Sequence, residues 1–328
     1  MPSSILHPPS SHALITGGAG FIGSHLAERL LADGASVTVI DDLSTGSLDN
    51  LKTAQTNPRF RFIQAKVSEC AELPELMAAA NQVFHLAAAV GVELVVHSPV
   101  RVIETNLHET EVLLQAATAN RTPVLLASTS EVYGKSAKHV FSEEDDLLIG
   151  PPTHARWSYA CSKLMDEFLA LAYAKERGLP IIIARFFNTV GPRQTGRYGM
   201  VLPRFIAAAR RGEPLRVYGD GSQSRCFCYV QDTVEALVRL THCPTATNQI
   251  FNIGSTEEIS IAALAALVIK TLGSRSTLQL VLYNEAYEPG FEDMRRRKPS
   301  VEKLAQFTGF KPTTTLREII ERTAASSS

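Results

Sequence analysis

Short apolar segments alternate with amphipathic segments along the chain up to about Phe186. The stretches Phe21–Ala32 and Val102–Ala117 carry apolar residues at helical spacing, which suits helices that cross between strands. The short apolar runs are typical of strands buried on both faces of a parallel sheet, and they are Ala13–Thr16, Ser36–Asp41, Arg61–Gln64, Gln82–His85, Val124–Ala127 and Ile181–Ala184. The pattern therefore predicts an α/β fold with a doubly wound parallel sheet.

This alternation breaks down after Phe186, where longer loops at 188–199 and 283–299 separate shorter helices and strands. We predict a loose N-terminal tail over 1–12, a sheet domain over 13–185, and a smaller mixed α/β substrate lobe over 186–323. The lobe is expected to interleave with the first domain and to fold onto the carboxyl edge of the sheet, where open α/β sheets bind ligands.

A glycine-rich turn, Thr16-Gly17-Gly18-Ala19-Gly20-Phe21-Ile22-Gly23, follows the first predicted strand. Glycines let the backbone turn tightly and approach a pyrophosphate, whose charge is met by free N–H groups at the helix start. The second strand ends in a pair of aspartates about 20 residues on, where a carboxylate can accept from both ribose hydroxyls and repels a 2′-phosphate. This spacing predicts an NAD site, in preference to NADP, formed by Gly17, Gly20, Phe21, Ile22, Gly23, Asp41 and Asp42.

A tyrosine and a lysine four residues apart, Tyr159 and Lys163, lie at the start of the helical stretch Ser158–Ala174. Residues at this spacing share a helix face, so both side chains can point into one cleft. A nearby ammonium and a cationic nicotinamide both favour the phenolate. We therefore predict Tyr159 as a catalytic base, with Lys163 as its partner.

Hydroxyl and carboxylate side chains follow the fifth predicted strand, in the segment Ser128-Thr129-Ser130-Glu131. The carboxyl ends of parallel strands face a bound cofactor, so these side chains are placed to meet the substrate. We predict Thr129 and Glu131 as catalytic residues and Ser130 as a substrate contact.

Composition excludes several other classes of protein. The formal net charge is −1, so no global field recruits nucleic acid or an anionic membrane, and no apolar run is long enough to span a bilayer. The five cysteines lack metal-ligand spacing, which favours packed, reduced thiols in a cytoplasmic protein without a metal. Residues 1–12 have neither a basic nor an apolar signal region.

These motifs resemble the extended short-chain dehydrogenases that act on nucleotide sugars, a family that includes 4-epimerases, UDP-glucuronate decarboxylases and 4,6-dehydratases. The resemblance runs from Ala13 to about Ile320 and implies a Rossmann domain in which Ala87 and Lys163 also contact NAD. It also implies a UDP-linked sugar substrate, held by the diphosphate contact Asn188, the base contacts Val217 and Tyr218, the phosphate contact Arg225, and Arg297. Further matching motifs are His85-Leu86-Ala87-Ala88, Asn106, Arg185-Phe186-Phe187-Asn188-Thr189-Val190-Gly191-Pro192, Pro214-Leu215-Arg216-Val217-Tyr218-Gly219, Ser222-Gln223-Ser224-Arg225 and Arg297-Lys298-Pro299.

The resemblance divides between two reactions that share a 4-keto intermediate. Thr129-Ser130-Glu131 and the Arg297 motif resemble the decarboxylases, whereas the loop 89–95 resembles the epimerases and lacks the tyrosine with which decarboxylases hold the uronate. Glu93, in that loop, is expected to repel a uronate. We therefore predict a UDP-sugar 4-epimerase, with UDP-glucuronate decarboxylase as the alternative, and rank a 4,6-dehydratase or a non-catalytic NAD-binding protein lower.

The chain departs from the family pattern at two positions, and the resemblance also implies an oligomeric state. Lys66 stands where an aspartate commonly binds the adenine amine, and Glu109 stands where glycine is usual, which is expected to alter helix packing. Relatives commonly dimerise through two helices of each subunit, which implies a homodimer formed by the stretches Val102–Ala117 and Ser158–Ala174.

Overall fold

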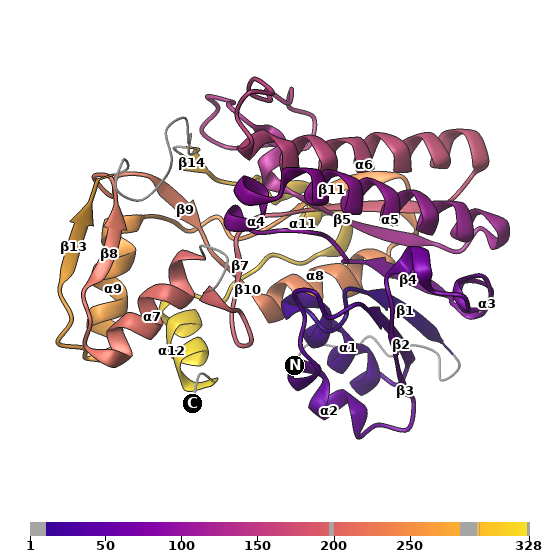
Figure 1. Ribbon diagram of the computed structural model, residues 1–328, viewed down its shortest axis with the longest axis horizontal. Helices are drawn as coiled ribbons and strands as arrows, with labels where there is room; N and C mark the ends of the chain where they lie inside the picture. Colours follow the sequence, from indigo (N-terminus) through magenta and orange to yellow (C-terminus); the bar gives the residue numbers. More distant parts are fainter. Residues whose placement is uncertain (1–10, 197–199, 283–293, 295, 327–328) are drawn as a thin grey trace.

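The structure, a computed structural model, describes residues 11–196, 200–282, 294 and 296–326, apart from the side chains of Val92, Glu93 and Val96. Most of the chain surrounds one parallel sheet, and a second lobe lies at one end of it (Figure 1). No helix within the described residues is both long and apolar enough to cross a bilayer.

The central sheet has seven strands in the order β11-β6-β5-β4-β1-β2-β3, all parallel. The six predicted strands are present, and β5 and β6 run further toward the site than their apolar runs predicted, because polar residues continue the pairing there. The strands are β1 (His12–Thr16), β2 (Ser36–Asp41), β3 (Phe60–Gln64), β4 (Gln82–His85), β5 (Val124–Thr129), β6 (Ile181–Phe186) and β11 (Gln249–Ile253). The pattern did not predict β11, which follows the second-lobe segment and returns to pair with β6.

Alternating strand residues bury opposite faces of this sheet. Ile15 and Val39 pack in a core with α1 and α8, whereas Leu14 and Ile40 pack in a core with α3, α5 and α6. This two-layer covering is the doubly wound arrangement that the pattern predicted. The helices of these layers are α1 (Phe21–Ala32), α2 (Lys52–Gln55), α3 (Leu73–Ala79), α4 (Val92–His97), α5 (Pro99–Asn120), α6 (Arg156–Arg177), α8 (Val230–Thr241) and α11 (Glu302–Thr308).

The second lobe has its own core, built from buried residues such as Phe205, Val217 and Leu264. Its elements are β7 (Thr189–Val190), α7 (Val201–Arg211), β8 (Leu215–Tyr218), β9 (Ser224–Cys226), β10 (Cys228–Tyr229), β12 (Glu258–Ser260), α9 (Ile261–Leu272), β13 (Leu278–Val281), β14 (Arg296–Arg297) and α12 (Leu316–Ser326). The lobe lies beside the edge of the sheet at which β5 and β6 end (Figure 1). That position leaves a cavity between the lobe and the sheet.

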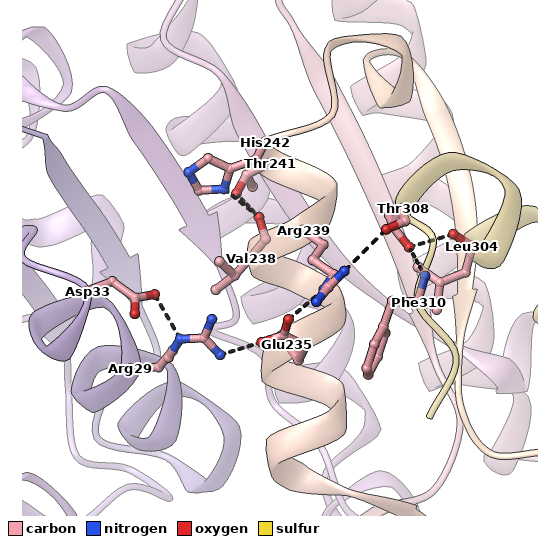
Figure 2. A network of polar contacts seen from close by, with 10 residues as sticks. All are labelled: Arg29, Asp33, Glu235, Val238, Arg239, Thr241, His242, Leu304, Thr308 and Phe310. Carbon is pink, nitrogen blue, oxygen red and sulfur yellow. Dashed lines mark hydrogen bonds and ion pairs between the residues drawn. The ribbon is translucent and has the colours of Figure 1, made fainter. Parts of the chain in front are cut away.

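Ion pairs join α1 to α8, and a hydrogen bond joins α8 to α11, on one face of the sheet (Figure 2). Arg29 binds Asp33 at 2.7 Å and Glu235 at 2.5 Å, and Glu235 also binds Arg239 at 2.5 Å. Arg239 in turn donates to the carbonyl oxygen of Thr308 at 3.4 Å. Because α1 follows the glycine-rich turn, this network anchors that turn to a helix from beyond residue 186.

Candidate active site

A cavity of about 870 Å³ lies between the carboxyl edge of the sheet and the second lobe. Of the residues predicted for cofactor, substrate or catalysis, only Val217 does not line it. Those that do are Gly17, Gly20, Phe21, Ile22, Gly23, Asp41, Asp42, Ala87, Thr129, Ser130, Glu131, Tyr159, Lys163, Asn188, Tyr218, Arg225 and Arg297. The fold thus brings residues from both parts of the chain to one site.

The glycine-rich turn leaves no room for side chains. Gly17 has φ +72°, and a Cβ there would lie 2.6 Å from the amide nitrogen of Ala87; a Cβ at Gly23 would lie 2.4 Å from the carbonyl oxygen of Gly17. Gly20 caps the N-terminus of α1 without a side-chain hydrogen bond to the helix. The first N–H groups of α1 therefore open into the cavity, where they suit a pyrophosphate.

Asp41 ends β2 beside this turn and is held by the backbone. Its Oδ2 accepts from the amide of Ala19 at 2.9 Å and its Oδ1 from the amide of Leu43 at 2.8 Å. Burial raises the pKa of the Asp41 carboxyl, and the two backbone hydrogen bonds oppose that rise. Each carboxylate oxygen has a further lone pair for a ribose hydroxyl, so this end of the cavity fits the adenosine half of a dinucleotide.

Tyr159 and Thr129 meet where β5 ends and α6 begins. Tyr159 is 9% exposed, and its side chain lies close to that of Thr129. Burial and the carboxylate of Glu131 raise the pKa of Tyr159, against the hydroxyl of Thr129, which lowers it. Within the protein alone, these groups favour the phenol form of Tyr159.

Lys163 is paired with a carboxylate on the same helix. Its Nζ donates to Asp166 Oδ2 at 2.7 Å, and the side chains of Lys163 and Asp166 are 3% and 0% exposed. The sequence reasoning overlooked Asp166, although its position three residues after Lys163 on a helix was a usable signal.

Glu131 and Arg297 bring opposite charges into the cavity from the two parts of the chain. Arg297 Nη1 lies 3.3 Å from Glu131 Oε1, and their side chains are 14% and 20% exposed. Both residues line the cavity together with Tyr159. This end of the site therefore combines a hydroxyl, a phenol, a carboxylate and a guanidinium.

The predicted residues of the second lobe divide between the cavity and the core. Asn188, Tyr218 and Arg225 line the cavity, and Asn188 Nδ2 is anchored to the carbonyl oxygen of Cys226 at 3.1 Å. Val217 is fully buried in the core of the lobe, because alternate residues of β8 point to opposite sides and Tyr218 takes the cavity side. The side chain of Val217 thus packs in the lobe core and does not line the cavity.

Sequence reasoning missed several arginines that line the cavity. Arg204 stacks over the Tyr218 ring with 5.0 Å between its guanidinium carbon and the ring centroid. Arg193 is fixed by Glu28 at 2.6 Å. The others are Arg101, Arg156 and Arg216. Apart from Arg216, these arginines lie outside the motifs quoted above, so the fold was needed to show that this cavity is suited to a strongly anionic ligand.

Both departures from the family pattern have a visible outcome. Glu109 accepts from the amide of Ser68 at 2.9 Å and from its hydroxyl at 2.7 Å, which ties α5 to the turn after β3. Lys66 pairs with Glu69 at 2.6 Å and lines the cavity. The side chain of Glu93 lies outside the described residues.

The cysteines do not form a site within the described part of the chain. All five are free, and burial raises the pKa values of Cys226 and Cys228 to about 12. No group of three or more His, Cys, Asp or Glu side chains that could hold a metal is found among the described residues. None of the five cysteines is among the residues that line the cavity.

Comparison with known proteins places this chain among nucleotide-sugar enzymes. Residues 13–254 match the model of the NAD dependent epimerase/dehydratase family. The chain is 42% identical over 311 residues to the UDP-N-acetyl-alpha-D-glucosaminuronate decarboxylase of Bacillus cytotoxicus, with 94% of this chain and 95% of that protein covered. It is 36% identical to UDP-glucuronic acid decarboxylase 1 of Xenopus tropicalis, with 94% and 70% covered.

Solved structures with the same fold include epimerases. A UDP-glucuronic acid 4-epimerase from Bacillus cereus, solved with UDP-glucuronic acid and NAD, has a TM-score of 0.86 at 28% identity, with 96% of this chain and 98% of that chain covered. A UDP-N-acetylglucosamine 4-epimerase from Methanobrevibacter ruminantium has a TM-score of 0.87 at 28% identity, with 97% and 98% covered.

Proposed function

Since the chain belongs to the NAD-dependent epimerase/dehydratase family, we propose that it decarboxylates a UDP-linked uronic acid through a 4-keto intermediate. The observation that carries this proposal is the position of Arg297 and Glu131, a cation and a carboxylate in contact at the end of the cavity that Tyr159 lines. A uronate carries its carboxylate on C5, next to C4, whose hydroxyl reacts. A guanidinium can bind that carboxylate through two hydrogen bonds.

The cavity fits NAD as the cofactor of this family. The narrow glycine turn at Gly17 and Gly23 admits a pyrophosphate, and Asp41 is placed for the adenosine ribose. When bound, NAD serves as the acceptor and donor of the C4 hydride. The protein supplies binding, orientation and proton transfer.

In the first step Tyr159 removes the proton of the C4 hydroxyl, and Thr129 holds that oxygen by hydrogen bonding. These residues already contact one another. The product is a ketone at C4 beside the carboxylate on C5, which is a β-keto acid.

In the second step the bond between C5 and the carboxylate carbon breaks and carbon dioxide leaves. Its electron pair becomes an enolate between C5 and C4, whose oxygen Tyr159, now protonated, and Thr129 can stabilise. The Glu131 carboxylate is placed to relay a proton from water to C5, which converts the enolate to the ketone, and Arg297 holds the substrate carboxylate until it departs. The ketone is then reduced back to an alcohol, so NAD shows no net change.

Two considerations favour decarboxylation over the 4-epimerisation that the sequence predicted. Decarboxylases include a relative at 42% identity, whereas the two epimerase structures are 28% identical. The arginines of the cavity also suit a third negative charge beside the diphosphate. The higher identity to the N-acetylglucosaminuronate decarboxylase makes the 2-acetamido uronate the first substrate to assay.

The test is an incubation of the NAD-loaded enzyme with four substrates: UDP-glucuronate, UDP-N-acetylglucosaminuronate, UDP-glucose and UDP-N-acetylglucosamine. Mass spectrometry would show loss of carbon dioxide, and sugar composition would show inversion at C4. We expect a UDP-pentose from a uronate. Inversion at C4 without loss of mass would restore the epimerase assignment.

A homodimer through α5 and α6 is a further part of this proposal. The two helices pack against each other, and Val100, Met165 and Phe168 lie exposed on them at 65%, 54% and 61%. Apolar side chains gathered on such a helix pair fit a second copy of the chain. Light scattering on wild type and Phe168→Glu should show a dimer and a monomer, respectively; a monomeric wild type would contradict it.

A further inference from the structure

Lys163 and Asp166 form an ion pair in the interior of the protein. Lys163 Nζ donates to Asp166 Oδ2 at 2.7 Å, and neither side chain is more than 3% exposed. Exposed pairs of this spacing are common and contribute little to stability, but a buried charge that loses its partner is strongly unfavourable. Each of these residues therefore depends on the other.

One oxygen of the Asp166 carboxylate has no hydrogen-bond partner among the described residues. Its Oδ2 binds Lys163, whereas its Oδ1 is buried and unpaired. A separate buried chain of contacts runs through α5 and the sheet: Thr110 Oγ1 lies 3.1 Å from His85 Nε2, and His85 Nδ1 lies 2.7 Å from Thr16 Oγ1 at the end of β1. Lys163 is therefore the group whose hydrogen bond holds the Asp166 carboxylate.

The charges that face Tyr159 form two neutral pairs. Glu131 and Arg297 approach it from the 3-10 helix after β5 and from β14, and they pair with each other at 3.3 Å. Lys163 and Asp166 approach from α6. Behind them His85 of β4 is kept neutral, because burial and the charge of Lys163 lower its pKa to about 3. These two pairs thus add no net positive charge beside Tyr159.

We propose that Asp166 is a positioning residue that cancels the charge of Lys163, so that Tyr159 acts as a base only beside a cationic cofactor. The inference rests on the proposed role of Tyr159. It gives proton transfer a direction: beside oxidised, cationic NAD the phenol gives up its proton and can accept the one on the C4 hydroxyl, and beside the neutral reduced form the phenol state is restored. One residue then acts as base and later as acid.

The test is a titration of Tyr159 in the NAD-bound protein, without substrate. The phenolate absorbance of each protein minus that of its Tyr159→Phe counterpart isolates this tyrosine. Asp166→Asn keeps the size of the side chain and removes its charge, so Tyr159 should titrate about one pH unit lower. The acid limb of kcat/KM for the uronate should move down equally. Unchanged titration in a folded Asp166→Asn protein would overturn the proposal.

Glu167 provides the matched control. It is the next residue of α6 and equally buried, but it binds Arg185 at 2.7 Å rather than Lys163. Glu167→Gln should destabilise the protein and leave the titration of Tyr159 in place. An equal shift in both variants would mean a general effect of charge removal and would also overturn the proposal.

Thermal melting of Lys163→Met, Asp166→Asn and the double variant tests whether the two charges depend on each other. This test works even if Asp166→Asn folds poorly. Removing both charges leaves no uncompensated ion, so the double variant should melt at a higher temperature than Asp166→Asn. A double variant that melts no higher would refute the pairing. Because the titration and the melting need no turnover, a wild type inactive on every UDP-sugar would remove the proposed function alone.

Discussion

Glu131 Oε1 lies 3.3 Å from Arg297 Nη1, so two residues 166 positions apart meet beside the reacting groups. One comes from the end of a central strand and the other from the second lobe. Packing of the lobe against the sheet therefore assembles the part of the cavity on which the proposed decarboxylation depends.

Removing the charge of either Glu131 or Arg297 should impair the proposed decarboxylation, each in a different kinetic parameter. We expect Glu131→Gln to slow carbon dioxide release by about 10²-fold to 10⁴-fold, the range for a positioned acid or base. Arg297→Met should chiefly raise KM for the uronate, because the cation that binds the substrate carboxylate is lost. Glu302→Gln, at an exposed site with its own partner Lys311, is the control and should match wild type. Unchanged carbon dioxide release in Glu131→Gln would remove it from the mechanism.

Tyr159→Phe should abolish turnover and spare nucleotide binding, because the ring still packs and only the hydroxyl is lost. The expected loss of kcat is at least about 10²-fold. Calorimetric titration with UDP checks binding in parallel with the rate. A variant with a near-normal rate would exclude Tyr159 as the base.

Gly17→Ala should impair NAD binding more than it impairs folding. The residue has φ +72°, and its Cβ would lie 2.6 Å from the amide of Ala87, so the turn must shift away from the pyrophosphate site. Gly212→Ala is the control, since that glycine has φ +69° with no atom near its Cβ position. Both changes cost about 1 kcal/mol of backbone strain, but only Gly17→Ala should raise the Kd for NAD, by at least about tenfold, or about 1.4 kcal/mol. Equal Kd values would contradict this.

Glu235 should make the stability of the protein sensitive to acid. Although burial raises the pKa of this carboxyl, hydrogen bonds from Arg29 and Arg239 bring it below its usual value. A group with a lowered folded-state pKa stabilises the protein above its unfolded pKa, about 4.3, and this stability is lost as pH falls through the folded pKa. The melting temperature of wild type should therefore fall further than that of Glu235→Gln when the pH is lowered below the unfolded pKa of about 4.3. Identical pH profiles would contradict the contribution of this network.

Local patterns in the sequence determined the strands, the glycine turn and the placement of Tyr159 and Lys163 on one face of a helix. The strand and helix periods are properties of neighbouring residues, and the narrow turn at Gly17 requires glycine wherever the rest of the chain lies. Six of the seven strands of the sheet and the glycine turn that lines the cavity could therefore be predicted.

Only the tertiary structure decided which distant groups meet and which charges cancel. Strand β11 joins β6 across the second-lobe segment, Val217 turns into the lobe core while Tyr218 faces the cavity, and Arg297 reaches Glu131. The charge on Lys163 could be read from sequence, but its neutralisation by Asp166 depends on burial of both groups. The effect of a charge depends on its partners and on its exposure to water, and both are set only when the whole chain has packed.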